Sequence, residues 1–270
     1  MAASGDFTGP QFYDECMGPV QFGPFAADLA GRMPSDIRGK VLEIACGTGL
    51  VTRELRKRLL PSVNLVATDL GTQMLEYAKQ QVAAAGIEWR QADAQDLPFA
   101  DGEFAAVVCG FGLMFPPDRR QALAQARRVL APGGLLLFNV WDRIEENPHA
   151  LANAQVVESR FPGDADMKFR TPYELHDPTL LRSLLEQAGF AEIVIETRRI
   201  AITGADPRRI ALGQIRGTPR AALLVQRGVP LDEVIEEVAA ALARQGGDPY
   251  HGHAQALVVQ ARAPSTKAVS

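Results

Sequence analysis

The stretch that most constrains this chain is residues 41–49, Val-Leu-Glu-Ile-Ala-Cys-Gly-Thr-Gly, followed directly by an amphipathic segment over residues 50–60. An apolar run, a glycine turn and a helical pattern predict a buried parallel strand, a tight turn and a helix whose N-terminus faces the turn. Gly47 and Gly49 have no Cβ to keep a ligand away from the backbone. Glu43 places a carboxylate late in that strand, where a buried charge needs a partner. By itself the pattern also fits a turn that needs two glycines for its own geometry.

A second apolar run, residues 64–70, ends in an acid at Asp69, twenty positions beyond Gly49. A carboxylate at the tip of the second strand of a βαβ unit is placed to accept both hydroxyls of a ribose. We expect it to be a ligand group and not a structural partner. The dinucleotide fingerprint would have a third Gly or Ala at position 52, where this chain has Thr52. The two strands therefore predict a nucleoside site and weaken an NAD interpretation.

The two segments described above are the first of four sequence motifs that follow one another along the chain. They are E-x-A-C-G-T-G from Glu43, A-T-D-L-G-T-Q-M-L from Ala67, Q-A-D-A-Q-D-L-P-F from Gln91 and V-L-A-P-G-G-L-L-L from Val129. Together they resemble class I S-adenosylmethionine-dependent methyltransferases, and among these the ubiquinone/menaquinone C-methyltransferase-like small-molecule branch. The motifs span about residues 40–141, roughly half the chain. The resemblance implies S-adenosyl-L-methionine as cofactor and S-adenosyl-L-homocysteine as product, whereas the spacing alone indicates only a nucleoside site.

The resemblance implies a set of adenosine contacts at the carboxyl ends of the strands, where parallel sheets bind their ligands. Asp69 would hold the ribose, Leu70 and Met74 would pack on the adenine, and Asp93 with the Ala94 amide would bind the adenine edge. Each contact has an alternative in ordinary structure. Leu70 and Met74 stand at a helix start, where such residues often belong to the core. Asp93 would also suit as the cap of the turn that follows it.

The same resemblance implies contacts to the methionine part of the cofactor. Glu43 would tie the glycine turn from below, Cys109 and Phe111 would line the methyl donor, and Tyr13 would approach from the N-terminal segment. An aromatic residue that merely covers one end of the sheet is the alternative for Tyr13. The full predicted cofactor set is Tyr13, Glu43, Ala45, Gly47, Thr48, Gly49, Asp69, Leu70, Met74, Asp93, Ala94, Cys109 and Phe111.

Catalytic residues are harder to predict from the sequence than cofactor contacts. In-line methyl transfer requires alignment of the reactants and exclusion of water, and it does not require a protein nucleophile. We take His149, eight residues beyond Trp141 at the end of the fifth predicted strand, as the general base. An electron-rich acceptor that needs no base is the alternative. His251 and His253 have a spacing that suits a metal, but no further ligand is indicated, so we predict no metal site.

Alternating strand and helix patterns predict an α/β fold, a doubly wound, mostly parallel seven-stranded sheet of the Rossmann-like methyltransferase type. The predicted parts are an N-terminal helical cover over residues 1–36, a cofactor-binding core over 37–205, a helical cap over 206–250 inserted between strands six and seven, and the last core strand within 251–263. The predicted cover has helices at 10–17 and 24–33, separated by a break at Gly18-Pro19.

The predicted cap consists of three helical pieces divided at Gly217 and Gly228. We expect it to shape the acceptor pocket, with a dimerising pair of helices as the alternative. Four arginines within the cap would favour an anionic or phenolate acceptor, or would form a solvated helix face. They are Arg208, Arg209, Arg216 and Arg220.

Composition excludes several other classes of protein. The 270 residues carry a formal net charge of −4, which gives no electrostatic case for a nucleic-acid partner. No apolar run reaches the length of a membrane span, and residues 1–6 lack the pattern of a signal peptide. Three widely spaced cysteines at 16, 46 and 109 indicate reduced thiols and hence a cytoplasmic protein. We expect a monomer or homodimer.

The function that these observations favour is methyl transfer from S-adenosylmethionine to the oxygen, carbon or nitrogen of a small organic acceptor. An NAD(P)-dependent oxidoreductase is the first alternative. The second is a non-methylating relative that keeps the cofactor fold for binding or for cyclisation. The identity of the acceptor stays open at this point.

Overall fold

The computed structural model describes residues 9–168 and 170–265 of the chain, which divides into two compact units. The first, here called the sheet unit, comprises Phe25–Asp142, Pro172–Arg198 and the described residues from Ala256 to position 265. The second, the helical unit, comprises the described residues from position 9 to Pro24, Arg143–Thr171 and Arg199–Gln255. The boundaries thus differ from the four segments expected from the sequence.

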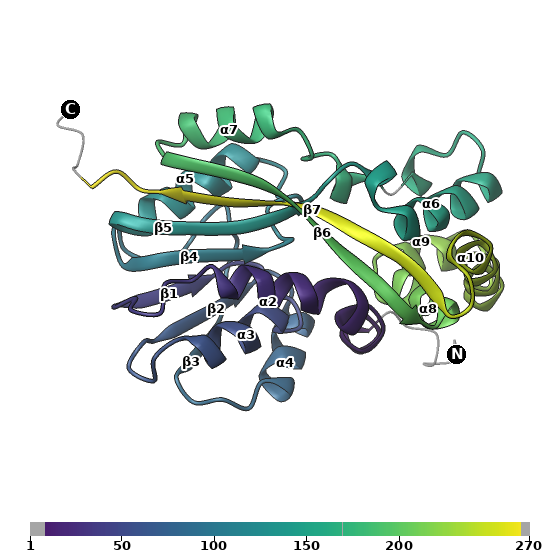
Figure 1. Ribbon diagram of the computed structural model, residues 1–270, viewed down its shortest axis with the longest axis horizontal. Coiled ribbons are helices and arrows are strands. Elements are labelled where there is room, and N and C mark those ends of the chain that lie inside the picture. The colour runs from purple at the N-terminus through teal and green to yellow at the C-terminus, as the bar shows by residue number, and fades with distance from the viewer. Residues whose placement is uncertain (1–8, 169, 266–270) are drawn as a thin grey trace. The chain divides into compact units, whose positions relative to one another are not determined.

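Seven strands form one sheet in the order β3-β2-β1-β4-β5-β7-β6 (Figure 1). Their bounds are β1 Lys40–Glu43, β2 Leu65–Asp69, β3 Ile87–Gln91, β4 Phe104–Gly110, β5 Leu130–Trp141, β6 Ala191–Ala205 and β7 Tyr250–Arg262. Strands β1 to β5 are parallel, and β7 runs antiparallel to β5. The chain order reverses between β1 and β4, and ligands of doubly wound sheets bind at such a point. The predicted fold class is confirmed.

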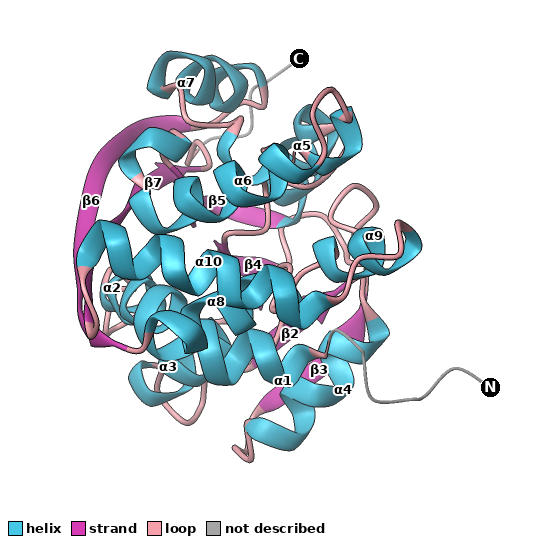
Figure 2. Ribbon diagram, turned by 90° about the vertical axis from the view of Figure 1, so that its right-hand side faces the viewer, coloured by secondary structure: helices cyan, strands magenta, loops and turns pink. Residues whose placement is uncertain are grey.

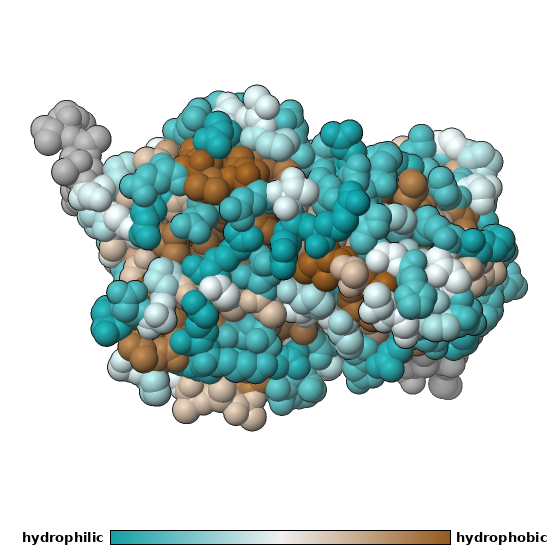
Figure 3. Space-filling model, in the orientation of Figure 1, coloured by the Kyte–Doolittle hydropathy of each residue, from teal (hydrophilic) through white to brown (hydrophobic). Residues whose placement is uncertain are grey.

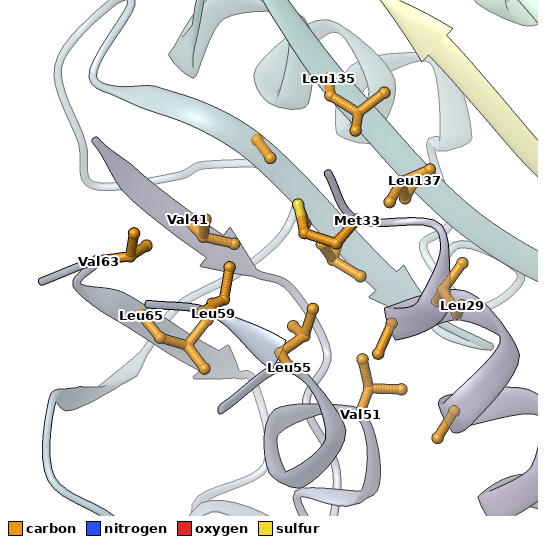
Figure 4. Packing of buried hydrophobic residues seen from close by; sticks show 14 of the residues in the cluster. Leu29, Met33, Val41, Val51, Leu55, Leu59, Val63, Leu65, Leu135 and Leu137 are labelled. Carbon is orange, nitrogen blue, oxygen red and sulfur yellow. The ribbon is translucent and has the colours of Figure 1, made fainter. Parts of the chain in front are cut away.

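Helices cover both faces of the sheet unit because each presents one apolar stripe to it. They are α2 Gly23–Gly31, which begins in the helical unit, α3 Leu50–Arg58, α4 Thr72–Gln81, α5 Arg119–Val129 and α7 Pro178–Gln187. Figure 4 shows Leu55 of α3, and Leu59 just after its end, beside Val41 of β1 and Leu65 of β2. All four are buried, and burial of each such side chain contributes about 1.5–3 kcal/mol. This packing holds α3 against β1 and β2.

The helical unit contains the predicted helical insertion. Its helices are α1 Pro10–Phe12, η1 Tyr13–Phe22, η2 Ile144–Glu146, α6 Pro148–Arg160, η3 Ala165–Met167, α8 Pro207–Arg216, α9 Arg220–Gln226 and α10 Leu231–Gly246. The predicted breaks at Gly217 and Gly228 are confirmed, since α8, α9 and α10 are separated at these points. Figure 2 shows α6, α8 and α10 side by side. Asp206 caps α8 by accepting the Arg208 N–H at 2.8 Å.

The predicted break at Gly18-Pro19 is wrong, because the helix η1 runs through both residues. Proline in an α-helix loses a donor and clashes with the preceding turn. Here the turns are wider, and the Gly23 N–H donates to the Gly18 carbonyl five residues earlier.

Hydrophilic residues dominate the surface seen in Figure 3, although hydrophobic residues gather beside α7 in the sheet unit. Leu180 of α7 is 42% exposed. Within residues 9–168 and 170–265, no helix is both long and apolar enough to cross a membrane.

Candidate functional site

The turn between β1 and α3 has three residues with left-handed backbone conformations. Their φ angles are 55° at Ala45, 55° at Gly47 and 84° at Gly49. A Cβ added at Gly49 would come 2.8 Å from Val82 Cγ2, so this glycine is required by packing. A Cβ added at Gly47 would meet no described atom within 4 Å. Gly47 therefore leaves open space above the turn, as a ligand that lies against the backbone requires.

Asp69, at the end of β2, holds this turn in place. Its Oδ2 accepts the Gly47 N–H at 2.8 Å, and its Oδ1 accepts the Gly71 N–H at 2.8 Å. Burial raises the pKa of the carboxyl although the amides of Gly47, Gly71 and Leu70 act to lower it. A carboxylate has about four acceptor positions, so at least one remains for a ribose hydroxyl. The expectation that Asp69 has no structural role is wrong, because it braces two backbone segments, while the ribose contact stays a prediction.

An apolar surface adjoins Asp69. Leu70 is 63% exposed, so it lies outside the core. Met74 is partly buried, and its Cγ would lie 3.7 Å from a Cβ added at Gly71. These two side chains offer an apolar surface of the kind that an adenine ring requires, and the contact itself stays a prediction.

Asp93 follows β3 and belongs to a turn. Its Oδ1 accepts the Gln95 N–H at 2.8 Å, and its backbone bridges to Asp96. The turn-capping alternative therefore has direct support in the hydrogen bonding. Ala94 is half-buried beside it. Contact of Asp93 and Ala94 with adenine stays a prediction.

Glu43, the last residue of β1, is 1% exposed. Burial raises the pKa of its carboxyl to about 8, and the negative charge of Asp69 adds to the rise. The backbone N–H of Thr52 acts to lower the pKa, but burial outweighs it, and the Thr52 hydroxyl has no hydrogen-bond partner within the described chain. The Oε2 atom of Glu43 likewise has no hydrogen-bond partner among the described residues. At pH 7 the group is therefore mainly a neutral acid.

The two cysteines near Glu43 are inert. All three cysteines of the chain are free and buried. Burial raises the pKa of the Cys46 thiol far above its ordinary range, and raises that of Cys109 to about 12. Both are protonated at neutral pH, so neither is an activated nucleophile.

The tip of β4 packs directly on the glycine turn. A Cβ added at Gly112 would collide with the Cβ of Ala45 and would come 2.7 Å from Cys109 Sγ. Phe111 has a φ of 54°, and its N–H donates to Asn139 Oδ1 at 2.9 Å. The tip of β4 and the turn after β1 therefore form one close-packed edge.

Aromatic rings extend this edge. The Phe111 ring stacks on Trp141 with centroids 4.0 Å apart and an interplanar angle of 22°. Phe25 meets both rings edge-on at 5.4 Å, and Tyr173 lies 6.3 Å from Trp141. Phe111 is thus held by neighbouring rings, and its proposed place beside the methyl donor stays a prediction.

Sequence reasoning missed Asn139 and Gly112, which fix the tip of β4. A signal was present for each. Asn139 is a polar residue within an otherwise apolar strand, and Gly112 completes a G-x-G pair with Gly110 at a strand end.

Tyr13 and His149 belong to the helical unit, whereas the other predicted site residues belong to the sheet unit. The Tyr13 ring stacks on Phe22 at 4.6 Å. His149 is buried, its Nδ1 lies 3.2 Å from the His253 carbonyl oxygen, and burial lowers its pKa to about 4. The ring is therefore neutral at pH 7. Both predicted roles stay predictions.

The four arginines of the predicted cap have partners of their own. Arg208 pairs with Glu236 at 2.7 Å and Arg216 with Asp232 at 3.0 Å. Arg209 donates to the Glu15 carbonyl at 2.9 Å, and buried Arg220 donates to Asn153 Oδ1 at 2.7 Å. Arg208 is exposed, as the solvated-face alternative requires, whereas Arg216 and Arg220 are buried. The preference for an anionic acceptor stays a prediction.

No cluster of three metal-binding side chains occurs in the described part of the chain. The residues at the edge of the sheet unit do fit a nucleoside that carries a methionine chain. The open space above Gly47 and the spare acceptor capacity of Asp69 are the features that allow this fit.

Comparison with known proteins identifies the class. A methyltransferase domain family matches residues 41–134. A ubiquinone/menaquinone biosynthesis C-methyltransferase, UbiE of Teredinibacter turnerae, is 32% identical over 183 residues, which cover 62% of this chain and 72% of that protein. The chain belongs to the class I S-adenosylmethionine-dependent methyltransferases and is an enzyme of that family. This result replaces the NAD(P) oxidoreductase interpretation.

Two solved structures share the fold. Phosphoethanolamine N-methyltransferase 2 of Haemonchus contortus, in complex with phosphomonomethylethanolamine and S-adenosylhomocysteine, matches with a TM-score of 0.60 and 17% identity, over 96% of this chain and 58% of that one. The cyclase SpnF matches with a TM-score of 0.56 and 18% identity, over 90% of this chain and 81% of that one. At these identities the likeness extends to the fold alone.

Proposed function

We propose that the sheet unit binds S-adenosylmethionine across the turn after β1 and the tip of β2, and that the enzyme methylates a small organic acceptor. The observation that carries this proposal is the pairing of Asp69 with the Gly47 amide beneath open space. A ribose placed there would meet a charged acceptor, and the methionine chain would lie along a backbone without side chains.

Each predicted cofactor residue has a defined task in this proposal. Asp69 orients the ribose, while Leu70 and Met74 support the adenine, whose edge meets Asp93 and the Ala94 amide. The methionine part lies over the turn, formed by Ala45, Gly47, Thr48 and Gly49 above Glu43. Cys109 and Phe111 stand toward the methyl donor. The close approach of Gly112 to Ala45 supports this arrangement, because the rate of an in-line transfer depends on how well the reacting atoms are held in alignment.

The bound cofactor supplies an electrophilic methyl group, and the chain aligns the acceptor with it and excludes water. We propose a quinol or related aromatic ring as acceptor, methylated at carbon. Support comes from the name of the Teredinibacter relative, a ubiquinone/menaquinone C-methyltransferase. We retain His149 as the proposed general base. Its neutral ring can direct the Nδ1–H to the His253 carbonyl, which would leave Nε2 as a proton acceptor.

Two measurements test this function. S-Adenosylhomocysteine should raise the melting temperature of the purified protein and NADP should not, since a ligand that binds only the native state stabilises it. Labelled cofactor should then transfer its methyl group to a quinol in a panel that also contains phenols and amines. Stabilisation without transfer to any member would instead favour a non-methylating relative, such as a cyclase.

A further inference from the structure

Glu43 places a buried carboxyl group within the proposed cofactor site. Its backbone lies in the middle of the sheet, paired with Ala67 of β2 on one side and Val108 of β4 on the other. Its carboxyl is buried, and Oε2 has no hydrogen-bond partner in the described chain. A buried polar atom without a partner has lost its hydration and gained no hydrogen bond in exchange, which is unfavourable. Such an atom in a native structure calls for an explanation through a ligand, a proton or a catalytic role.

The groups around this carboxyl are neutral or negative. Asp69 faces it from β2, the thiols of Cys46 and Cys109 from the turn and β4, and Thr52 from α3. No described arginine, lysine or histidine is among the groups that shift its pKa. A second negative charge next to Asp69 would be unfavourable here, so the proton stays on Glu43 in the free protein.

The proposed methyl donor brings one more positive charge to these groups than its product does. S-Adenosylmethionine carries a positive sulfonium in addition to its ammonium group, and S-adenosylhomocysteine carries only the ammonium group. A positive charge near a buried carboxyl favours its ionised form, and the attraction is strong because little water screens it. Ionisation would convert the carboxyl group of Glu43 into a carboxylate, which is a charged hydrogen-bond acceptor beneath the turn.

We propose that Glu43 is a positioning residue whose protonation state makes the site bind the methyl donor in preference to the demethylated product. It releases its proton to solvent when the sulfonium cofactor binds, and the resulting carboxylate pairs with the added positive charge. When the methyl group leaves, the sulfonium becomes a neutral thioether, and Glu43 takes one proton back from solvent. This inference rests on the proposed cofactor site and adds to it a reason for product release.

The consequence is a pH-dependent preference for the donor over the product. Affinity for the donor rises with pH as long as the free protein holds the proton and the complex does not, by up to about tenfold per pH unit. Affinity for the product lacks this component. The Glu43→Gln variant, which has a neutral side chain of similar shape, should bind the donor more weakly above pH 8 and should lose this part of the pH dependence.

Titration calorimetry in two buffers of different ionisation enthalpy measures the protons released on binding. We expect nearly one proton more for the wild type than for Glu43→Gln when S-adenosylmethionine binds near pH 7, and no such excess with S-adenosylhomocysteine. Protons released by the ligand's own amine are the same for both proteins, so they cancel in the difference between wild type and variant. Glu54→Gln, on the exposed pair with Lys57, is the matched control and should behave as wild type.

Equal proton release by wild type and Glu43→Gln would overturn the inference. Failure of the wild type to bind either ligand would instead overturn the proposed cofactor site, so the two failures are distinguishable. If Glu43→Gln does not fold, difference infrared spectroscopy on the wild type decides. A protonated-carboxyl band should disappear when the donor binds and persist with the product, and persistence with both ligands would refute the role.

Discussion

Replacement of Glu43 by glutamine should make the cofactor-free protein more stable at alkaline pH. The pKa of Glu43 rises from 4.5 to about 8 on folding, because burial disfavours the charged form. Below pH 4.5 both states hold the proton, and the group has no pH-dependent effect on stability. As pH rises from 4.5 to about 8, the unfolded state loses its proton while the folded state keeps it, so stability falls.

The magnitude follows from the size of that rise. At 1.36 kcal/mol per pKa unit, the rise corresponds to about 5 kcal/mol of stability lost between the two pH limits. Glutamine does not titrate, so Glu43→Gln should lose none of it. Relative to wild type, the variant should therefore gain about 5 kcal/mol in its free energy of unfolding between pH 4.5 and pH 8.5.

Urea unfolding followed by circular dichroism at pH 4.5, 6.5 and 8.5, without cofactor, provides the measurement. Glu54→Gln serves again as control, because the side chain of Glu54 lies on the surface of α3 in a pair with Lys57. Surface pairs contribute little, so this variant should follow the wild type within about 1 kcal/mol. If the difference between wild type and Glu43→Gln were the same at every pH, the carboxyl would be hydrated or paired in the folded state, and the reasoning would fail.

Three further predictions concern the same turn and the helical insertion. Asp69→Ala should weaken S-adenosylhomocysteine binding by about 2–4 kcal/mol and also lower the melting temperature, because two backbone amides lose their acceptor; unchanged affinity in calorimetry would place the nucleoside elsewhere. Gly49→Ala should destabilise the fold by roughly 2–3 kcal/mol through its left-handed backbone and its contact with Val82, whereas Gly47→Ala should cost about 1 kcal/mol in urea unfolding and act mainly on cofactor affinity. If residues 206–245 form a lid, hydrogen exchange should slow there only when acceptor joins the cofactor; full protection from the outset would count against a lid.

Much of the sheet unit could be predicted from the chain because its signals are local. The apolar run before Glu43, the glycine turn and the acid at Asp69 each occupy a few consecutive residues, and strand and helix periods alternate clearly after them. The helical insertion could be predicted equally well, since Gly217 and Gly228 interrupt apolar stripes of helical spacing. Family membership followed from the same motifs.

Other features depended on contacts between segments far apart in the chain. The sequence marks Asp69 as a ligand for ribose, but only the fold brings its carboxylate to the Gly47 amide, 22 residues earlier. Asn139 reaches the Phe111 amide across 28 residues. The wide helical turn at Pro19 was also hidden, because proline in a local pattern indicates a break.

The protonation state of Glu43 shows most clearly what the sequence determines and what only the tertiary structure determines. Its sequence position shows an acid at the end of a buried strand, and this alone predicts that a partner is needed. Whether that partner exists depends on which side chains surround it from β2, β4 and α3. The tertiary structure brings Asp69 and two thiols to it and no described cation, so the carboxyl keeps its proton. Residue type is local information, whereas burial and the surrounding charges are properties of the assembled fold, and these determine the pKa.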